Sequence, residues 1–217
     1  IAPKVHDFTW AADPDYIHDI YEGPNGVKLN FYYKNDPKII DNWKALQPVT
    51  AELMEFFNEN IGVYPYKQYS VVQGGDGGME YSMLTLVNYG NEFVPLVSVT
   101  SHELAHAWFQ GVLATNEMNH EWMDEGAASF FGDLAESFVL GSNFNNSIRS
   151  SYARYISLAN SGQEMPQSTN ANRYKYNRAY ESTAYSKGFV FLSQLRYIIG
   201  LDAFNETIKN YYNTYKF

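Results

Sequence analysis

Cysteine is absent from the 217 residues of this sequence. Without it the chain cannot form disulfides, use a thiolate as a nucleophile or hold zinc through sulfur. Any metal ion must therefore be bound by histidine and carboxylate side chains. Basic residues are also scarce, because 15 Lys and Arg stand against 24 Asp and Glu and give a formal net charge of −9. Scattered basic residues do not form the positive surface that phosphates require, so we expect no nucleic-acid partner.

Long apolar runs are missing as well. No run approaches the roughly 18 apolar residues of a membrane-spanning helix, so we expect no membrane span here. The sequence starts without methionine or the apolar stretch of a signal peptide, and it stops inside a helical pattern at residues 215–217. We therefore interpret it as part of a longer chain whose other domains are its partners. The lack of cysteine and the abundance of Tyr and Asn favour an extracytoplasmic bacterial location, periplasmic or secreted.

The sequence is rich in apolar and aromatic residues, with 45% hydrophobic and 17% aromatic. A chain of this length and composition can bury one sizeable core, and it contains no repeat or linker that would divide it. We therefore expect a single domain over residues 1–217. Its sheet-containing part covers residues 1–93, and its helical lobe covers residues 94–217.

Strand patterns occupy the first third of the chain. Residues 27–31 alternate apolar and polar after a Gly-Pro-Asn-Gly turn, which predicts a hairpin with residues 16–21. Two more strands are predicted at residues 69–72 and 83–87, on either side of the glycine-rich run 74–78.

Helical spacing appears first between Ile39 and Phe57, where apolar residues recur at steps of three and four and Pro48 predicts a kink or break. Beyond about Val94 the pattern is almost wholly helical. A small sheet followed by helices predicts an α+β fold.

The sequence His-Glu-Leu-Ala-His at residues 102–106 lies in one of the predicted helices. Residues four apart on a helix lie on the same face, so His102 and His106 can reach one metal ion at about 2.0–2.1 Å. Glu103 points about 100° away from His102 yet stays beside the metal, where it can accept a proton from a bound water. The alternative interpretation is two surface histidines on a helix. Against it, the same face also carries apolar residues and should point inward.

A third ligand is needed, and Glu125 follows His106 after an eighteen-residue gap. This gap accommodates a helix end, a loop and the first turn of a second helix. Glu125 shares a helix face with small residues, which allow close helix approach. The alternative is a solvated acid near a helix start, which applies equally to Glu117 and Glu121.

Taken together, these segments resemble the aminopeptidase N family of gluzincin zinc metallopeptidases. Residues 102–109 and 122–126 look like its His-Glu-x-x-His and Glu ligand segments. Residues 77–81, Gly-Gly-Met-Glu-Tyr, are similar to the family's Gly-Ala-Met-Glu-Asn motif, and residues 184–188 to the segment with its catalytic tyrosine. Matches in the same order extend from near residue 7 to residue 217. The resemblance implies a thermolysin-like domain, with one zinc ion in a cleft between a small mixed sheet and a helical lobe.

The resemblance also implies roles for individual residues. His102, His106 and Glu125 are the zinc ligands, Glu103 is the general base, and Tyr185 stabilises the oxyanion. Glu80 binds the free amino terminus of a peptide substrate. Gly77, Gly78 and Met79 lie along the substrate backbone. Without the resemblance, residue spacing assigns no role to either residue. Glu80 would be an ordinary glutamate at a strand edge, and Tyr185 would be one of 19 tyrosines in the core or at the surface.

The implied activity is zinc-dependent removal of amino-terminal residues from peptides. A zinc endopeptidase, another hydrolase such as the epoxide-hydrolysing branch of the family, and a catalytically silent scaffold are the alternatives. Gly78 and Tyr81 depart from the Ala and Asn of the family motif. The family also takes a second amine-binding group from a preceding domain that this sequence does not contain.

Overall fold

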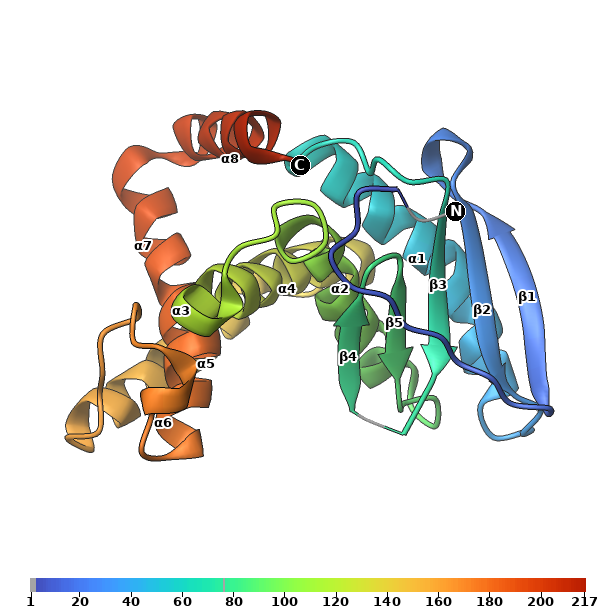
Figure 1. Ribbon diagram of the computed structural model, residues 1–217, viewed down its shortest axis with the longest axis horizontal. Coiled ribbons are helices and arrows are strands. Elements are labelled where there is room, and N and C mark those ends of the chain that lie inside the picture. Colours follow the sequence, from blue (N-terminus) through green and yellow to red (C-terminus); the bar gives the residue numbers. More distant parts are fainter. Residues whose placement is uncertain (1–2, 76) are drawn as a thin grey trace.

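The computed structural model describes residues 3–75 and 77–217, so that Asp76, in the glycine-rich run, lies outside the described residues. A five-stranded sheet forms one side of the molecule, in the order β1-β2-β3-β5-β4 (Figure 1). Its strands are β1 (Tyr16–Glu22), β2 (Lys28–Lys34), β3 (Gln68–Gln73), β4 (Gly78–Tyr81) and β5 (Leu84–Val87).

The sheet is mixed. β1 and β2 form the predicted antiparallel hairpin, with Tyr16 opposite Lys34, and Asn25 and Gly26 adopt positive φ angles in the connecting turn. β2 pairs in parallel with β3, and β3 with β5, whereas β4 runs antiparallel to β5 at the edge of the sheet. The strand β4 was not predicted from apolar alternation, because it begins inside the glycine-rich run.

Helices make up most of the remainder, as predicted, and most of them lie beyond the edge strand β4 (Figure 1). They are α1 (Ile40–Asn60), α2 (Phe93–Phe109), α3 (Glu117–Glu121), α4 (Ala127–Leu140), α5 (Phe144–Asn160), α6 (Asn177–Glu181), α7 (Gly188–Ile199) and α8 (Leu201–Tyr215). Two π-helical turns, η2 (Trp122–Gly126) and η4 (Ser182–Lys187), precede α4 and α7. The predicted α+β fold, a small mixed sheet followed by a mainly helical region, is therefore confirmed.

Helix α1 covers one face of the sheet and buries its apolar side there. It continues as one helix through Pro48, so the predicted kink or break at this residue is not a break. Trp43, Leu46, Leu53 and Phe57 are fully buried on either side of the proline. This apolar burial holds the helix together although proline removes one intrahelical hydrogen bond.

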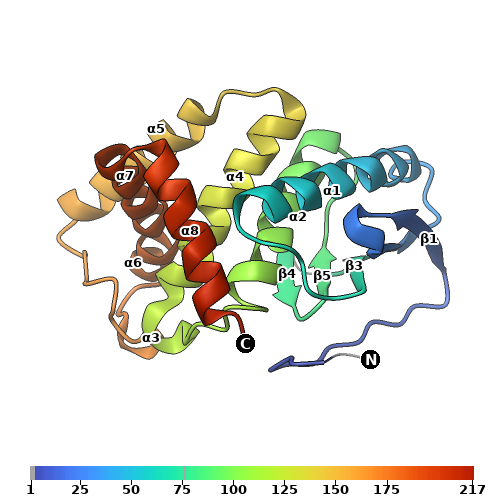
Figure 2. The ribbon, with the colours of Figure 1, turned by 90° about the horizontal axis from the view of Figure 1, so that it is seen from above.

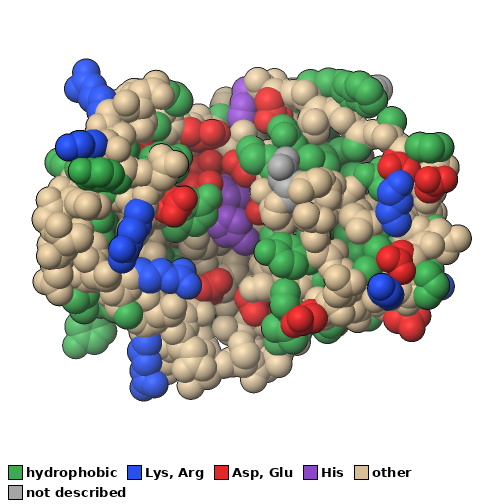
Figure 3. All heavy atoms as spheres, turned by 90° about the horizontal axis from the view of Figure 1, so that it is seen from below, with side chains coloured by type: hydrophobic (Ala, Val, Ile, Leu, Met, Phe, Trp, Pro, Cys, Tyr) green, Lys and Arg blue, Asp and Glu red, His purple; other side chains and the backbone are tan. Residues whose placement is uncertain are grey.

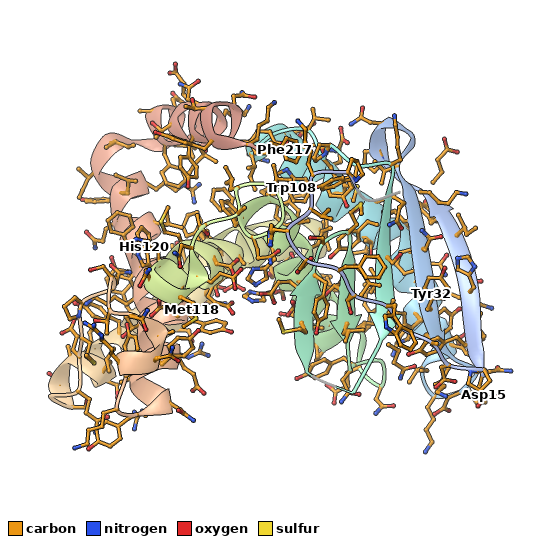
Figure 4. All side chains as sticks on the ribbon, in the orientation of Figure 1. Asp15, Tyr32, Trp108, Met118, His120 and Phe217 are labelled. Atoms are coloured by element: carbon orange, nitrogen blue, oxygen red, sulfur yellow. The ribbon has the colours of Figure 1, made fainter. Side chains whose placement is uncertain are left out.

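The core joins the sheet to the helices through aromatic residues. Trp108, labelled in Figure 4, packs against Phe57 with ring centroids 5.2 Å apart, and its indole N–H donates to the Gly62 carbonyl at 2.6 Å. Helix α2 packs against α4, with Phe109 stacked on Phe131. The helix that carries the two histidines is therefore fixed on two sides.

The segment before β1, residues 3–15, crosses the face of the sheet opposite α1 (Figure 2). His6 Nε2 donates to the Gln110 carbonyl at 2.9 Å, at the end of α2, and the Asp7 carboxylate accepts from the Ser82 amide at 3.0 Å, just after β4. This segment therefore fastens the end of α2 to the end of β4. None of the helices in the described chain is long and apolar enough to cross a membrane.

Candidate metal centre and catalytic cleft

Helix α2 presents His102 and His106 on one face. Their Nε2 atoms lie 3.1 Å apart, and the two rings are nearly perpendicular, at 84°. His106 is only 1% exposed, since the surrounding residues of α2, from Ser101 to Phe109, are mostly buried against the sheet and α4. The alternative of two surface histidines is therefore wrong for His106, whereas His102 is partly exposed and lines a cleft.

Glu125 comes to the same point from η2. Its Oε2 atom lies 3.3 Å from the Nε2 atom of His102 and 3.3 Å from that of His106. A tetrahedral ion about 2.0–2.1 Å from each ligand holds those ligand atoms about 3.3 Å apart, so the triangle fits a zinc ion without rearrangement. Burial opposes ionisation of Glu125, but its contacts with His102 and His106 lower its pKa well below the usual value. A carboxylate that stays ionised is suited to a cation.

The neighbouring Asp124 is a site residue that the sequence interpretation missed. Its Oδ1 atom lies 2.5 Å from Nδ1 of His106, on the side of the ring opposite Glu125, and both residues are buried. Burial lowers the pKa of His106, but the Asp124 and Glu125 carboxylates raise it well above its usual value. Such a carboxylate fixes the ring orientation and makes Nε2 a stronger ligand. The sequence signal that could have identified Asp124 is the acidic residue directly before Glu125 in Met-Asp-Glu-Gly.

Glu103, next to His102 on α2, turns toward β4. It is 5% exposed, and burial raises its pKa to about 7 although His106 acts in the opposite direction. Gly78 makes room for it, because a Cβ atom there would lie 2.2 Å from Oε1 of Glu103 and 2.7 Å from Cγ2 of Val99. Residue 78 is therefore glycine, in place of the alanine of the family motif, where the Glu103 carboxylate occupies the space of a side chain.

Glu80 approaches the site from the edge strand β4. Atoms of Glu80, His106 and Asp124 lie within 4.8 Å of one another, which places the Glu80 carboxylate beside the histidine–glutamate triangle. Burial raises the pKa of Glu80 to about 7, and the Asp124 and Glu125 carboxylates contribute. A cation near Glu80 would be favoured because it relieves this repulsion.

Tyr185 reaches the site from η4. Its hydroxyl donates a 2.6 Å hydrogen bond to Oε1 of Glu125, and its ring lies nearly parallel to that of His102, with centroids 5.9 Å apart. Burial and the Glu125 carboxylate raise the pKa of Tyr185 far above the usual value, so the hydroxyl keeps its proton and remains a donor.

A cleft of about 670 Å³ opens beside these residues, between β4 on one side and α2 and α4 on the other. Seen from below, the surface is hollowed there, and histidine and acidic side chains gather in the hollow (Figure 3). Gly77 and Gly78 line the cleft together with His102, Glu103 and Tyr185. Met79 is 36% exposed on β4 and lies outside the cleft lining. The other selected residues lie next to the cleft, Glu80 on β4 and His106 and Glu125 beside His102.

Comparisons with known proteins fit this arrangement. The family model described as "Peptidase family M1 domain" matches residues 46–217. "Leucine aminopeptidase 2" of Ajellomyces capsulatus is 25% identical over 211 residues, covering 91% of this chain and 33% of the relative. "Aminopeptidase N" of Rattus norvegicus is 26% identical over 218 residues, covering 89% of this chain and 22% of the relative.

Among solved structures, the crystal structure of an M1 zinc metallopeptidase from Deinococcus radiodurans matches with a TM-score of 0.72 and 22% identity, over 93% of this chain and 44% of that one. This likeness supports the fold. The chain spans a third or less of the length of the two named relatives.

Proposed function

The chain belongs to peptidase family M1, and from this premise we propose that it carries the catalytic site of a zinc aminopeptidase. The resemblance to aminopeptidase N in the sequence is confirmed by this family match. The observation that carries the proposal is the triangle of two imidazole nitrogens and one carboxylate oxygen, 3.1–3.3 Å on a side, with Glu103, Glu80 and Tyr185 around it. We likewise propose that residues 1–217 are the catalytic domain and that other domains of the same protein complete it.

His102, His106 and Glu125 would hold one zinc ion. Two neutral imidazoles and a carboxylate are a donor set that zinc favours at catalytic sites with three protein ligands. Bound there, zinc supplies Lewis acidity, which lowers the pKa of a coordinated water to about 7 and polarises a carbonyl.

Glu103 is the proposed general base. Its pKa of about 7 lies close to neutral pH, which suits a group that takes a proton from the attacking water and then gives it to the departing amine. Its buried Oε2 atom has no hydrogen-bond partner among the described residues. The carboxylate is therefore free to bind a reacting group.

Glu80 is the proposed receptor for the substrate's free amino terminus. A charged ammonium beside this buried carboxylate would form a strong hydrogen-bonded ion pair, and it would fix which peptide bond reaches the site. Tyr185 is the proposed oxyanion donor. Its hydroxyl, which donates to Oε1 of Glu125 in this structure, would turn to donate to the oxygen of the scissile carbonyl as negative charge develops there.

The test uses the full-length protein and an aminoacyl anilide paired with its N-acetylated form. We expect cleavage of the free-amine substrate and little cleavage of the acetylated one. Equal cleavage of both would remove Glu80 as the amine receptor and indicate an endopeptidase. Failure to bind zinc and to cleave any peptide would instead indicate a silent scaffold.

The matched control is Glu103→Gln, which preserves shape and removes the base. We expect it to bind zinc at the same stoichiometry and to lose turnover by several orders of magnitude.

A further inference from the structure

The side of the cleft opposite β4 carries a carboxylate that the proposed chemistry does not use. Asp133 lines the cleft from α4, one turn after Ser129, which lines it as well. Glu103 is the other acidic residue in the lining, and no Lys or Arg is among the described lining residues. A substrate side chain that enters the cleft therefore meets Asp133 as its one charged neighbour apart from the catalytic groups.

The position of Glu80 determines which part of a substrate enters the cleft. Gly77 and Gly78 line it, whereas Glu80, two residues further along β4, is not among the lining residues. A peptide whose amino terminus is held at Glu80 and whose chain follows the edge of β4 extends away from Glu80 toward Gly77. The residue after the scissile bond then lies in the cleft.

Asp133 has no basic partner in the described structure. The ion pairs that Lys and Arg side chains form there involve Asp13, Asp15 and Glu164. Burial raises the pKa of Asp133, and the Ser147 hydroxyl, His102 and Arg154 offset this only in part. Arg154 is exposed and borders a neighbouring hollow with Tyr185.

A second carboxylate strengthens the negative potential. Glu136 lies three residues after Asp133 on α4 and accepts a 2.7 Å hydrogen bond from Ser98, which itself lines the cleft. Burial raises the pKa of Glu136, and the proximity of Asp133 adds to this shift. Val94, Pro95 and Val99 supply apolar lining, against which the methylene groups of a long basic side chain can pack.

We propose that Asp133 selects peptides with lysine or arginine immediately after the scissile bond. This inference rests on the proposed aminopeptidase function and adds the substrate class. The physical basis is the attraction between a cation and a partly desolvated carboxylate, which is stronger than at an exposed surface.

The experiment compares three dipeptide amides, Leu-Lys-amide, Leu-norleucine-amide and Leu-Glu-amide, with full-length protein and release of leucine as the readout. Norleucine has the four-carbon chain of lysine without its charge. We expect kcat/KM for Leu-Lys-amide to exceed that for Leu-norleucine-amide by about tenfold, and Leu-Glu-amide to be the poorest substrate.

Asp133→Asn should abolish the preference for lysine, so that the ratio of kcat/KM for Leu-Lys-amide to that for Leu-norleucine-amide falls to about one. Asp133→Lys should reverse the order of the lysine and glutamate substrates. Asp202→Asn, an exposed residue of α8, makes the same chemical change away from the cleft and should preserve the preference.

Equal kcat/KM for the lysine and norleucine substrates would overturn the inference and leave the aminopeptidase function standing. A preference that survives Asp133→Asn would also overturn it. Failure of all three amides to be cleaved would overturn the proposed function itself.

Discussion

The Tyr185 hydroxyl donates a 2.6 Å hydrogen bond to Oε1 of Glu125, although the two residues are 60 positions apart in the sequence. Each belongs to a π-helical turn, Glu125 to η2 and Tyr185 to η4. The two turns meet at Gly126 and Gly188, where a Cβ atom on Gly126 would lie 2.6 Å from the Gly188 Cα atom. One backbone contact therefore positions both a proposed metal ligand and the proposed oxyanion donor.

Gly126→Ala should separate the two turns, because the methyl group meets backbone that cannot move aside. We expect a loss of about 1–3 kcal/mol in the free energy of unfolding, as for other overpacked sites, and weaker zinc binding. Thermal unfolding and competition with a chelator measure the two effects. Gly75→Ala is the control, since a Cβ atom there has no neighbour within 4 Å. Unchanged stability of Gly126→Ala would show that the turns have room to adjust.

Gly78→Ala should displace the Glu103 carboxylate, because the new Cβ atom would lie 2.2 Å from Oε1. We expect kcat to fall by about 10–100-fold with zinc content unchanged, since the base loses its alignment and the ligands do not. Steady-state kinetics and metal analysis of the purified variant provide the check. If the variant also loses zinc, Gly78 is needed for the position of the zinc ligands rather than for that of Glu103.

Asp124→Ala should weaken zinc binding by about 10–100-fold, because His106 loses the carboxylate that orients its ring. Asp124→Asn keeps a hydrogen-bond acceptor without the charge and should bind zinc with intermediate affinity. Dissociation constants from chelator competition distinguish the variants. Equal affinity of the wild type and both variants would assign Asp124 no part in holding His106.

Tyr185→Phe should lower kcat by about 10²–10³-fold, the cost of losing one hydrogen-bond donor to an oxyanion. KM and zinc stoichiometry should change little, because the aromatic ring and its packing beside His102 remain. A large change in KM with kcat preserved would place the hydroxyl in substrate binding instead.

Glu121 is 1% exposed, and neither of its carboxylate oxygens has a hydrogen-bond partner among the described residues. Burial raises its pKa from the ordinary 4.5, and the nearby Tyr174 acts in the opposite direction. When a carboxyl has a higher pKa in the folded state than in the unfolded state, its protonation stabilises the folded protein. This stabilisation is complete below the unfolded-state pKa and is lost as the pH rises through the folded-state pKa.

Glu121→Gln cannot ionise, so the variant should gain stability relative to the wild type at pH 8 and not at pH 4. The expected difference in melting temperature at pH 8 is about 2–4 °C, corresponding to about 1 kcal/mol in a chain of this size. Metal-free protein should be used at both pH values so that zinc binding does not contribute. An equal difference in melting temperature at pH 4 and at pH 8 would exclude titration of Glu121 as the cause of the difference.

The sequence allowed the order of sheet and helices to be predicted, because apolar spacing and turn residues are local signals. It also identified the His102–His106 pair, since their helical spacing is a direct geometric consequence of the sequence. The π-helical turns were missed, because local apolar spacing does not mark them and the close approach of Gly126 and Gly188 joins residues that are 62 positions apart. The spacing of Phe138 from Ala127 and Leu134 predicts one core face for all three residues, yet Phe138 is 68% exposed, since helical periodicity does not reveal where the neighbouring elements end.

The hydrogen bonds of His6 and Asp7 have a practical consequence for anyone who shortens this protein. A version that begins after residue 7 loses both bonds, at Gln110 and at Ser82, and the partly buried Val5, while every fully buried core residue and every proposed zinc ligand remain. Such a truncated protein should still fold and take up metal, yet its edge strand would be free to fray near Glu80. Low peptidase activity in that version would then reflect a loosened strand end rather than a missing catalytic group.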